Sequence, residues 1–145
     1  MAITFRYVHV PRQDGTLRKA PFISIFVRTK ENKLMRIVAL LDSGADTTVV
    51  PKGLAEILGL KEKEESIETG GIGGKVKVKK SKMSFQISSS REKYSLVIPV
   101  LILQDNTEDA PLFLGRQGFF ENFHITFRQN QEKVTIKKVE LRKRY

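Results

Sequence analysis

The chain has 145 residues, of which 40% are hydrophobic and 29% are charged, with a net charge of +10 and no cysteine. A chain of this length can bury the core of one domain, and no apolar run approaches the roughly 20 residues that span a bilayer. The lack of cysteine excludes disulfides, thiol catalysis and cysteine metal sites. Because the N-terminal segment lacks the apolar core of a signal peptide, we expect one domain, 1–145, in the cytoplasm and without a membrane partner.

The positive charge is concentrated in residues 75–145, which hold 15 basic and 7 acidic residues. Much of it lies in the segment 75–82 and in the C-terminal strand and tail, 133–145. Such a field could attract nucleic acid. However, the lysines of the first segment alternate with Val76 and Val78, which is typical of the solvated face of a strand. We favour the strand face over a nucleic-acid site.

The first half of the chain predicts strands before an acidic loop. Residues 3–10 alternate weakly and predict a strand, and a turn follows at 11–15. Phe22–Arg28 and Leu34–Leu41 predict a β-hairpin. Since 37–41 is continuously apolar, its second strand should be buried on both faces and should end at the carboxylate of Asp42.

A short helix is predicted after this loop. Residues 47–50 are rich in β-branched side chains and predict an extended segment. Pro51 suits the first position of a helix over Lys52–Leu58, with Gly59 as its C-terminal cap. Three apolar side chains would share one face of this helix: Leu54, Ile57 and Leu58.

The segment 67–78 contains four glycines around one isoleucine, Ile72, between two alternating strands. A plain turn rarely needs four glycines, because each costs backbone entropy on ordering. The pattern therefore predicts a hairpin whose tip closes over a ligand, with Ile72 as the contact. A phosphate-binding loop is the alternative, but the Gly-Lys-Ser/Thr ending and the following helix are missing.

The rest of the chain is predicted to be strands joined by turns, with a bulge or edge at Pro99 and a helical turn at 117–121. These strands are 83–87, 94–103, 111–116, 123–127 and 133–141. The two histidines, His9 and His124, are far apart, and His124 alternates with apolar residues as a solvent-side strand residue would. We expect no metal site, no cofactor and no Ser-His triad.

Three of these signals follow one another along the chain. They are Asp42-Ser43-Gly44-Ala45-Asp46, then Gly70-Gly71-Ile72-Gly73-Gly74, then Phe113-Leu114-Gly115-Arg116. An Asp-Ser-Gly triplet alone is common in loops, but the three together are specific. In this order and spacing, residues 22–127 resemble the retropepsins, the retroviral and retroviral-like aspartic proteases.

The resemblance implies a mainly β, closed, mostly antiparallel barrel-like fold with one or two short helices. It implies an aspartic endopeptidase that acts on peptides or unfolded proteins as a homodimer, with Asp42 of each chain in one shared site. Two carboxylates held about 3 Å apart cannot both ionise readily, so they share a proton. One then acts as base on a water molecule while the other polarises the scissile carbonyl.

Roles for other residues are also implied by the resemblance. Ser43 would hold the two loops together across the dimer, and Gly44 would contact the substrate backbone. Asp46 would bind the substrate main chain and pair with Arg116. Ala45 lies in the same supporting loop.

The substrate contacts implied by the resemblance lie in the other two segments. Ile72 would be the tip of a flap, with the substrate-binding glycines Gly70, Gly71 and Gly73 around it. Phe113 would line a side-chain pocket.

The chain departs from the viral pattern in its longer N-terminal part, in the basic segment after the glycine-rich hairpin and in its basic C-terminus. We therefore expect a free-standing cellular or microbial member whose dimer contacts differ from the viral ones. Two alternatives stay open: a catalytically silent dimerisation or peptide-binding module, and a basic nucleic-acid-binding β-domain. The second lacks an aromatic stacking platform, because the chain has no tryptophan and only three tyrosines.

Overall fold

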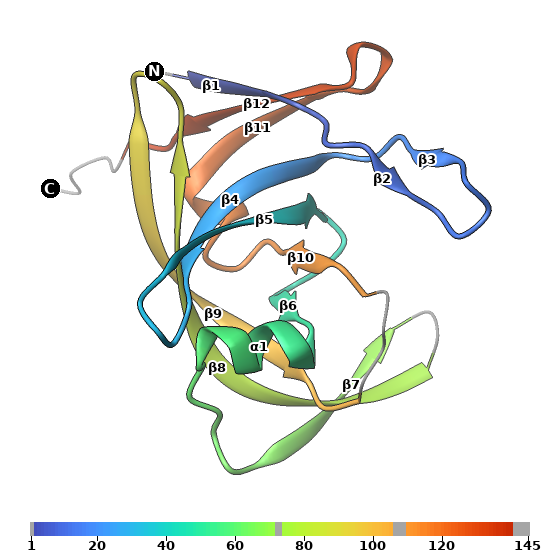
Figure 1. Cartoon of the computed structure of the whole chain (residues 1–145), viewed down its shortest axis with the longest axis vertical. Helices are drawn as coiled ribbons and strands as arrows, with labels where there is room; N and C mark the ends of the chain where they lie inside the picture. Colours follow the sequence, from blue (N-terminus) through green and yellow to red (C-terminus); the bar gives the residue numbers. More distant parts are fainter. Residues whose placement is uncertain (1, 72–73, 106–109, 141–145) are drawn as a thin grey trace, which may run out of the picture.

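The computed structural model describes residues 2–71, 74–105 and 110–140. Six strands form a closed barrel, and the pairing of Phe26 with Gln86 joins the first strand to the last (Figure 1). In barrel order they are β4 (Phe22–Arg28), β5 (Leu34–Leu41), β10 (Leu112–Leu114), β6 (Thr48–Val50), β9 (Lys93–Leu103) and β8 (Gly74–Ser88). The predicted mainly β, closed fold is confirmed. Its pairing is mixed, because β10 runs parallel to β5 and β6 runs parallel to β9.

The core of the barrel follows from alternation along its two longest strands. Every second residue of β9 from Leu96 to Ile102 is buried. The register partners of these residues on β8 include Met83 and Phe85, which are also buried. Since residues directly opposite across an antiparallel pair share a face, the two strands line one apolar interior.

A second sheet lies at one end of the barrel (Figure 1). It consists of β1 (Ala2–Arg6), β12 (Lys133–Lys138) and β11 (Phe123–Arg128), and a two-stranded ribbon, β2 (Val10–Pro11) with β3 (Leu17–Arg18), follows β1. The ring of Phe119 lies 6.2 Å from that of Phe85 on β8 and 5.2 Å from that of Phe123 on β11. This fully buried side chain therefore packs the sheet against the barrel.

Helix α1 (Lys52–Leu58) has the predicted bounds, and Gly59 caps it with a left-handed φ of 63°. Pro51 is the extended residue before the helix rather than its first residue. The predicted apolar face is wrong at Ile57, which is 47% exposed, because Ala55 takes the buried position beside Leu58. None of the described helices is long and apolar enough to cross a membrane.

Three other expectations from the sequence need correction. The first predicted strand ends early, at Arg6, and the chain then turns into the ribbon β2–β3. The helical turn predicted at 117–121 is a 3-10 turn, η1 (Phe120–Asn122), and a second 3-10 turn, η2 (Gln129–Gln131), joins β11 to β12. On β5, Ile37, Val38 and Leu40 are only half-buried and just Ala39 and Leu41 are buried, so the strand is not buried on both faces as expected.

Strand β9 has no bulge at Pro99, because its register with β8 continues through the pair Lys82–Pro99. On the other side, β6 begins to pair with β9 only at Val100. Pro99, which has no N–H to donate, therefore stands just outside this second ladder, as predicted for an edge position.

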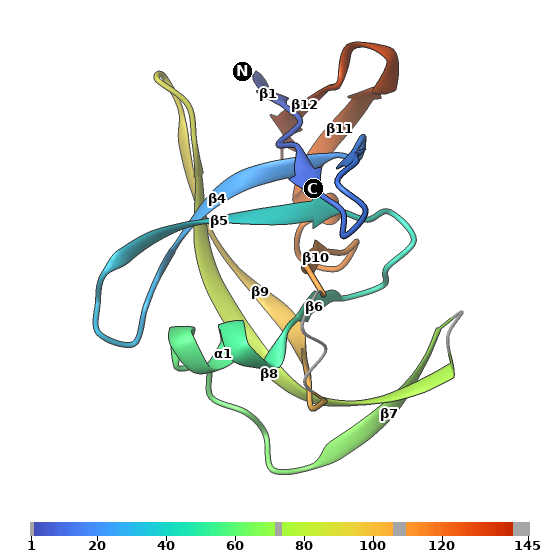
Figure 2. The same ribbon diagram turned by 45° about the vertical axis from the view of Figure 1, so that its right-hand side comes forward.

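The glycine-rich segment forms a hairpin of β7 (Ser66–Gly71) and the first part of β8. Figures 1 and 2 show this hairpin leaving the barrel on the side where the loop between β5 and β6 lies. The predicted tip residues Ile72 and Gly73 lie outside the described residues. The role of the hairpin as a cover for the acidic loop stays a prediction.

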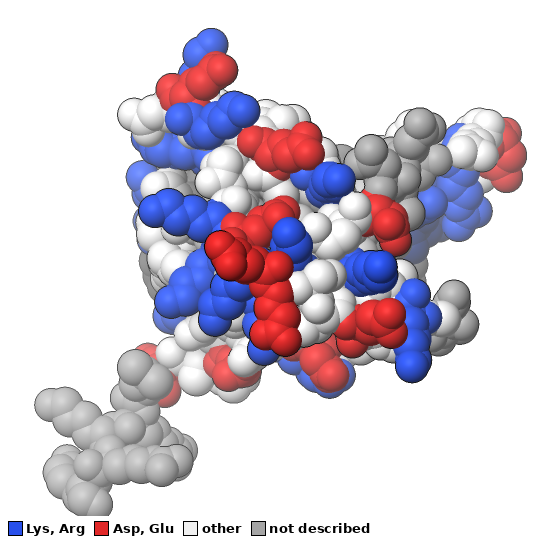
Figure 3. Space-filling view, turned by 90° about the horizontal axis from the view of Figure 1, so that it is seen from below, with Lys and Arg blue, Asp and Glu red and all other residues white. Residues whose placement is uncertain are grey.

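The basic segment 75–82 forms part of β8, and its lysines at 75, 77, 80 and 82 are exposed while Val78 is buried. Val76 is 40% exposed, so the alternation holds only in part. Figure 3 shows acidic and basic side chains interleaved on the face of the molecule seen from below. These observations support a solvated strand face.

Candidate active site

The loop after β5 is positioned by the parallel pairing of β5 with β10. Leu41 stands opposite Leu114, and the next residue, Asp42, donates its backbone N–H to the carbonyl oxygen of Leu114 at 3.0 Å. Both strand ends are buried. Two apolar strands far apart in sequence thus place Asp42 at the edge of the core, where its side chain is partly exposed.

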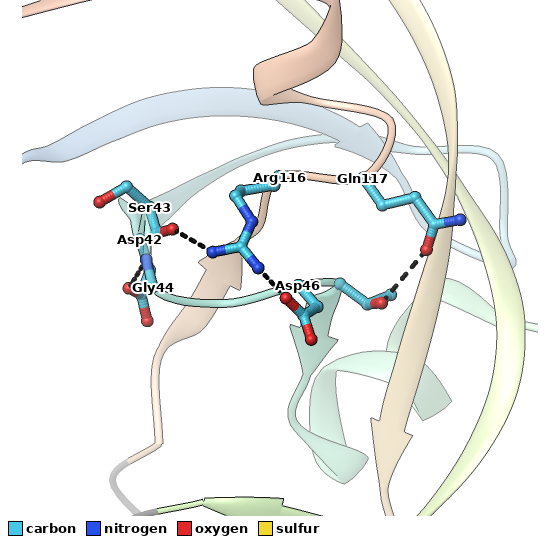
Figure 4. Close-up of polar contacts among 7 residues, drawn as sticks. Asp42, Ser43, Gly44, Asp46, Arg116 and Gln117 are labelled. Carbon is cyan, nitrogen blue, oxygen red and sulfur yellow. Dashed lines mark hydrogen bonds and ion pairs between the residues drawn. The ribbon is translucent and has the colours of Figure 1, made fainter.

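The side chain of Asp42 is held by its own turn. Oδ1 accepts a hydrogen bond from the N–H of Gly44 at 3.0 Å (Figure 4). The N–H of Ala45 donates to the Asp42 carbonyl at 3.2 Å. A Cβ at Gly44 would lie 3.2 Å from Oδ1, which is tighter than most contacts. In the described part of the chain, Oδ2 has no hydrogen-bond partner. The turn therefore fixes one oxygen and leaves the other available for chemistry.

A buried threonine supports this loop from below. Thr48 is fully buried, and its hydroxyl oxygen accepts a hydrogen bond from the N–H of Gly115 at 3.1 Å. Gly115 lies so close to the loop that a Cβ there would be 2.6 Å from the carbonyl carbon of Thr47. Neither Thr48 nor Gly115 was among the predicted site residues. The glycine after an apolar strand was a signal for close approach, whereas nothing in the sequence marks Thr48.

Arg116 holds the outer part of the loop. Its guanidinium donates to the carbonyl oxygen of Ser43 at 2.9 Å and forms an ion pair with Asp46 (Figure 4). Its backbone N–H donates to the carbonyl of Ala45 at 2.9 Å, and the N–H of Gln117 donates to that of Asp46 at 2.8 Å. The structure therefore brings Arg116 to Asp46, as the family resemblance implied.

The ion pair itself contributes little to stability, because the two side chains are 52% and 84% exposed. Exposed pairs are worth about 0–1 kcal/mol. The role of Arg116 is accordingly to fix the path of the loop around Asp42.

The predicted substrate-binding residues lie on two other elements. Gly70 and Gly71 end β7, opposite Lys75 and Gly74 of β8. Phe113 is half-buried between Leu40 and Val49, on the face of β10 that points away from the core. Their contact with a substrate stays a prediction.

The histidines take no part in this site. His9 lies 2.8 Å from the carboxylate of Glu132, and His124 is exposed on β11. Among residues 2–71, 74–105 and 110–140, no group of three or more His, Asp or Glu side chains could hold a metal ion.

Comparison with known proteins identifies a family for the chain. Residues 27–117 match the sequence model of a family described as "Aspartyl protease". A search of curated protein sequences found no match.

Among solved structures, a retropepsin-like aspartic protease from Rickettsia conorii is similar, with a TM-score of 0.55 and 19% identity over 93% of this chain and 98% of that one. The EIAV protease complexed with the inhibitor HBY-793 matches at a TM-score of 0.46 and 19% identity, over 74% of this chain and 88% of that one. The family match covers most of the chain, including the acidic loop and its arginine, and the barrel has the retropepsin-like fold. The chain belongs to the aspartyl protease family and has a retropepsin-like fold.

Proposed function

We propose that this protein is an aspartic endopeptidase that hydrolyses peptide bonds as a homodimer. The observation that carries the proposal is the geometry of Asp42, whose carboxylate is fixed through Oδ1 by Gly44 and open at Oδ2. Family membership and the hairpin on the same side of the barrel support it.

One carboxylate at one site cannot act as proton donor and acceptor in the same step. The chain has a single Asp-Ser-Gly triplet, so a second chain supplies the second Asp42. The two carboxylates share one proton, because like charges at about 3 Å oppose double ionisation. The ionised group takes a proton from water, and the protonated group donates a hydrogen bond to the scissile carbonyl as the tetrahedral intermediate forms.

The first test compares two Asp→Asn variants on an unfolded, fluorescently labelled protein at acidic pH. Asp42→Asn should lower kcat by about 10²–10⁴-fold and leave the far-ultraviolet circular dichroism unchanged. Asp14→Asn, which lies in the exposed ribbon β2–β3, should retain full activity. If Asp42→Asn cleaves as fast as the parent, the catalytic assignment is wrong, and a peptide-binding module becomes the better description.

The second test addresses the shared site. Parent chains are allowed to exchange with a ninefold excess of Asp42→Asn chains before the assay. Random pairing leaves only about one parent chain in ten with a parent partner, so activity per parent chain should fall to about that fraction. Undiminished activity in the mixture would show that each chain works alone.

A further inference from the structure

A cavity of about 620 Å³ lies beside the acidic loop, on the wall of the barrel made by β8 and β9. Its volume is within the range of about 300–1,000 Å³ typical of ligand sites. Its described lining contains four lysines and no Asp, Glu, Arg or aromatic residue. The lysines are Lys61, Lys63, Lys80 and Lys82.

Two of these lysines stand over an apolar floor. Lys80 and Lys82 alternate along β8 and so share a face, and both are exposed. Their register partners on β9 are Leu101 and Pro99, which also line the cavity. Because opposite residues of an antiparallel pair lie on the same face, the two ammonium groups flank an apolar strip.

The other two lysines are carried by the segment after α1, which is tied to β8. The N–H of Lys63 donates to the carbonyl of Lys80 at 3.0 Å, and the Ser81 hydroxyl donates to the carbonyl of Lys61 at 2.7 Å. Glu62, between the two lysines, pairs with Lys79 at 3.7 Å, and neither of them lines the cavity. The cavity therefore keeps a positive lining although the surrounding sequence is rich in glutamate.

We propose that this cavity docks an acidic peptide segment, with its carboxylates at the four lysines and an apolar side chain on the strip of Pro99 and Leu101. A phosphate ligand would favour the fork of arginine, and a nucleic acid would favour aromatic side chains for stacking. The described lining has neither. Charge complementarity and the apolar strip together favour a peptide.

The cavity reaches the active-site loop at one end. Thr47 and Gln117 both line it, and the hydroxyl of Thr47 donates to Oε1 of Gln117 at 3.2 Å. Their chain neighbours are Asp46 and Arg116, which form the ion pair of the loop. A docked segment would thus extend from a substrate bound at Asp42. The claim that the docked segment is part of a substrate rests on the proposed function. The claim that an acidic peptide binds in the cavity does not depend on that function.

The test measures binding in the absence of cleavage, with Asp42→Asn as the parent protein. A fluorescein-labelled ten-residue peptide of alternating Glu and Leu is titrated by anisotropy, with a Lys–Leu peptide and a short DNA duplex in parallel arms. Lys80→Glu/Lys82→Glu should weaken the Glu–Leu peptide at least about tenfold. Lys93→Glu/Lys137→Glu reverses two exposed lysines of β9 and β12 outside the cavity, keeps the net charge equal, and should leave affinity within about twofold.

A milder variant, Lys80→Gln/Lys82→Gln, replaces the first if charge reversal prevents folding, and it should lower affinity in the same direction. Equal weakening by the two Lys→Glu pairs would overturn the proposal in favour of a general charge effect. If the DNA duplex binds more tightly than the Glu–Leu peptide, and Lys80→Glu/Lys82→Glu abolishes that binding, the proposal is overturned in favour of a nucleic-acid site. If Asp42→Asn has no peptidase activity but still binds the Glu–Leu peptide, the docking site is distinct from the catalytic site.

Discussion

Replacement of Gly115 by alanine tests whether the close approach of the two strand ends builds the active-site loop. The added Cβ would lie 2.6 Å from the carbonyl carbon of Thr47 and 2.9 Å from the carbonyl oxygen of Ala45. Both atoms belong to the backbone, so they cannot rotate away as the end of a side chain could. The two segments must separate, and the hydrogen bonds of Gly115 to Thr48 and of Arg116 to Ala45 must lengthen or break.

The magnitude follows from these contacts. Overpacking costs about 1–3 kcal/mol, and each lost hydrogen bond costs about 0.5–1.5 kcal/mol. With two hydrogen bonds affected, Gly115→Ala should therefore destabilise the fold by about 2–6 kcal/mol, a large part of the roughly 5–15 kcal/mol typical of a domain. At about 3–4 °C per kcal/mol for a chain of this length, Tm should fall by about 6–24 °C.

Thermal unfolding by circular dichroism at one fixed protein concentration measures the change, because Tm depends on concentration when chains associate. Gly53→Ala is the matched control. A Cβ at this position in α1 meets nothing within 4 Å, and alanine favours a helix by up to about 1 kcal/mol, so Tm should rise slightly. If Gly115→Ala unfolds within about 2 °C of the parent, the packing argument fails.

Two further predictions concern side-chain hydrogen bonds. Thr48→Val should lower the free energy of unfolding by about 1–3 kcal/mol, because it leaves the N–H of Gly115 buried without an acceptor. The Thr47 hydroxyl bonds an exposed glutamine, so the control Thr47→Val should lower it by less than about 1 kcal/mol. Equal midpoints of urea unfolding for the two variants would contradict this prediction. Thr16→Val should raise the pKa of Asp14 toward its ordinary value of 3.8, since the hydrogen bond from the Thr16 hydroxyl is the largest cause of the lowered pKa. A carboxyl group whose pKa is lower in the folded than in the unfolded state stabilises the fold at pH values above its unfolded-state pKa. This stabilisation is lost as the pH falls through its folded-state pKa, so it disappears in acid. An NMR titration in which Thr16→Val leaves the midpoint of Asp14 unchanged would exclude the hydrogen bond as the cause.

The sequence predicted elements whose signals are local. The hairpin β4–β5 and helix α1 have the predicted bounds, because strand alternation, a polar turn and a capping glycine all lie within a few residues of each other. Asp42 at the end of β5 followed directly from this. The error at Ile57 has a local cause too, since a seven-residue helix offers two similar apolar faces and only packing selects the one with Ala55.

What local patterns could not predict is the arrangement that joins distant segments. The parallel pairing of β5 with β10 brings Leu114 to Leu41, and with it Arg116 to Asp46 across 70 residues. The pair was expected only because the chain resembles a known family. Thr48 has no such precedent in the sequence, where it is one of two adjacent threonines, and its burial depends on the position of Gly115.

Asp42 is held by hydrogen bonds from its own chain. They run from the loop to Leu114 and within the turn itself, and the supporting bonds of Arg116 and Gly115 are also internal. These bonds position the loop from within its own chain, and on the proposed mechanism a second chain adds the second carboxylate. On the proposed mechanism, dilution should lower activity per chain, because it separates the two carboxylates that share the proton.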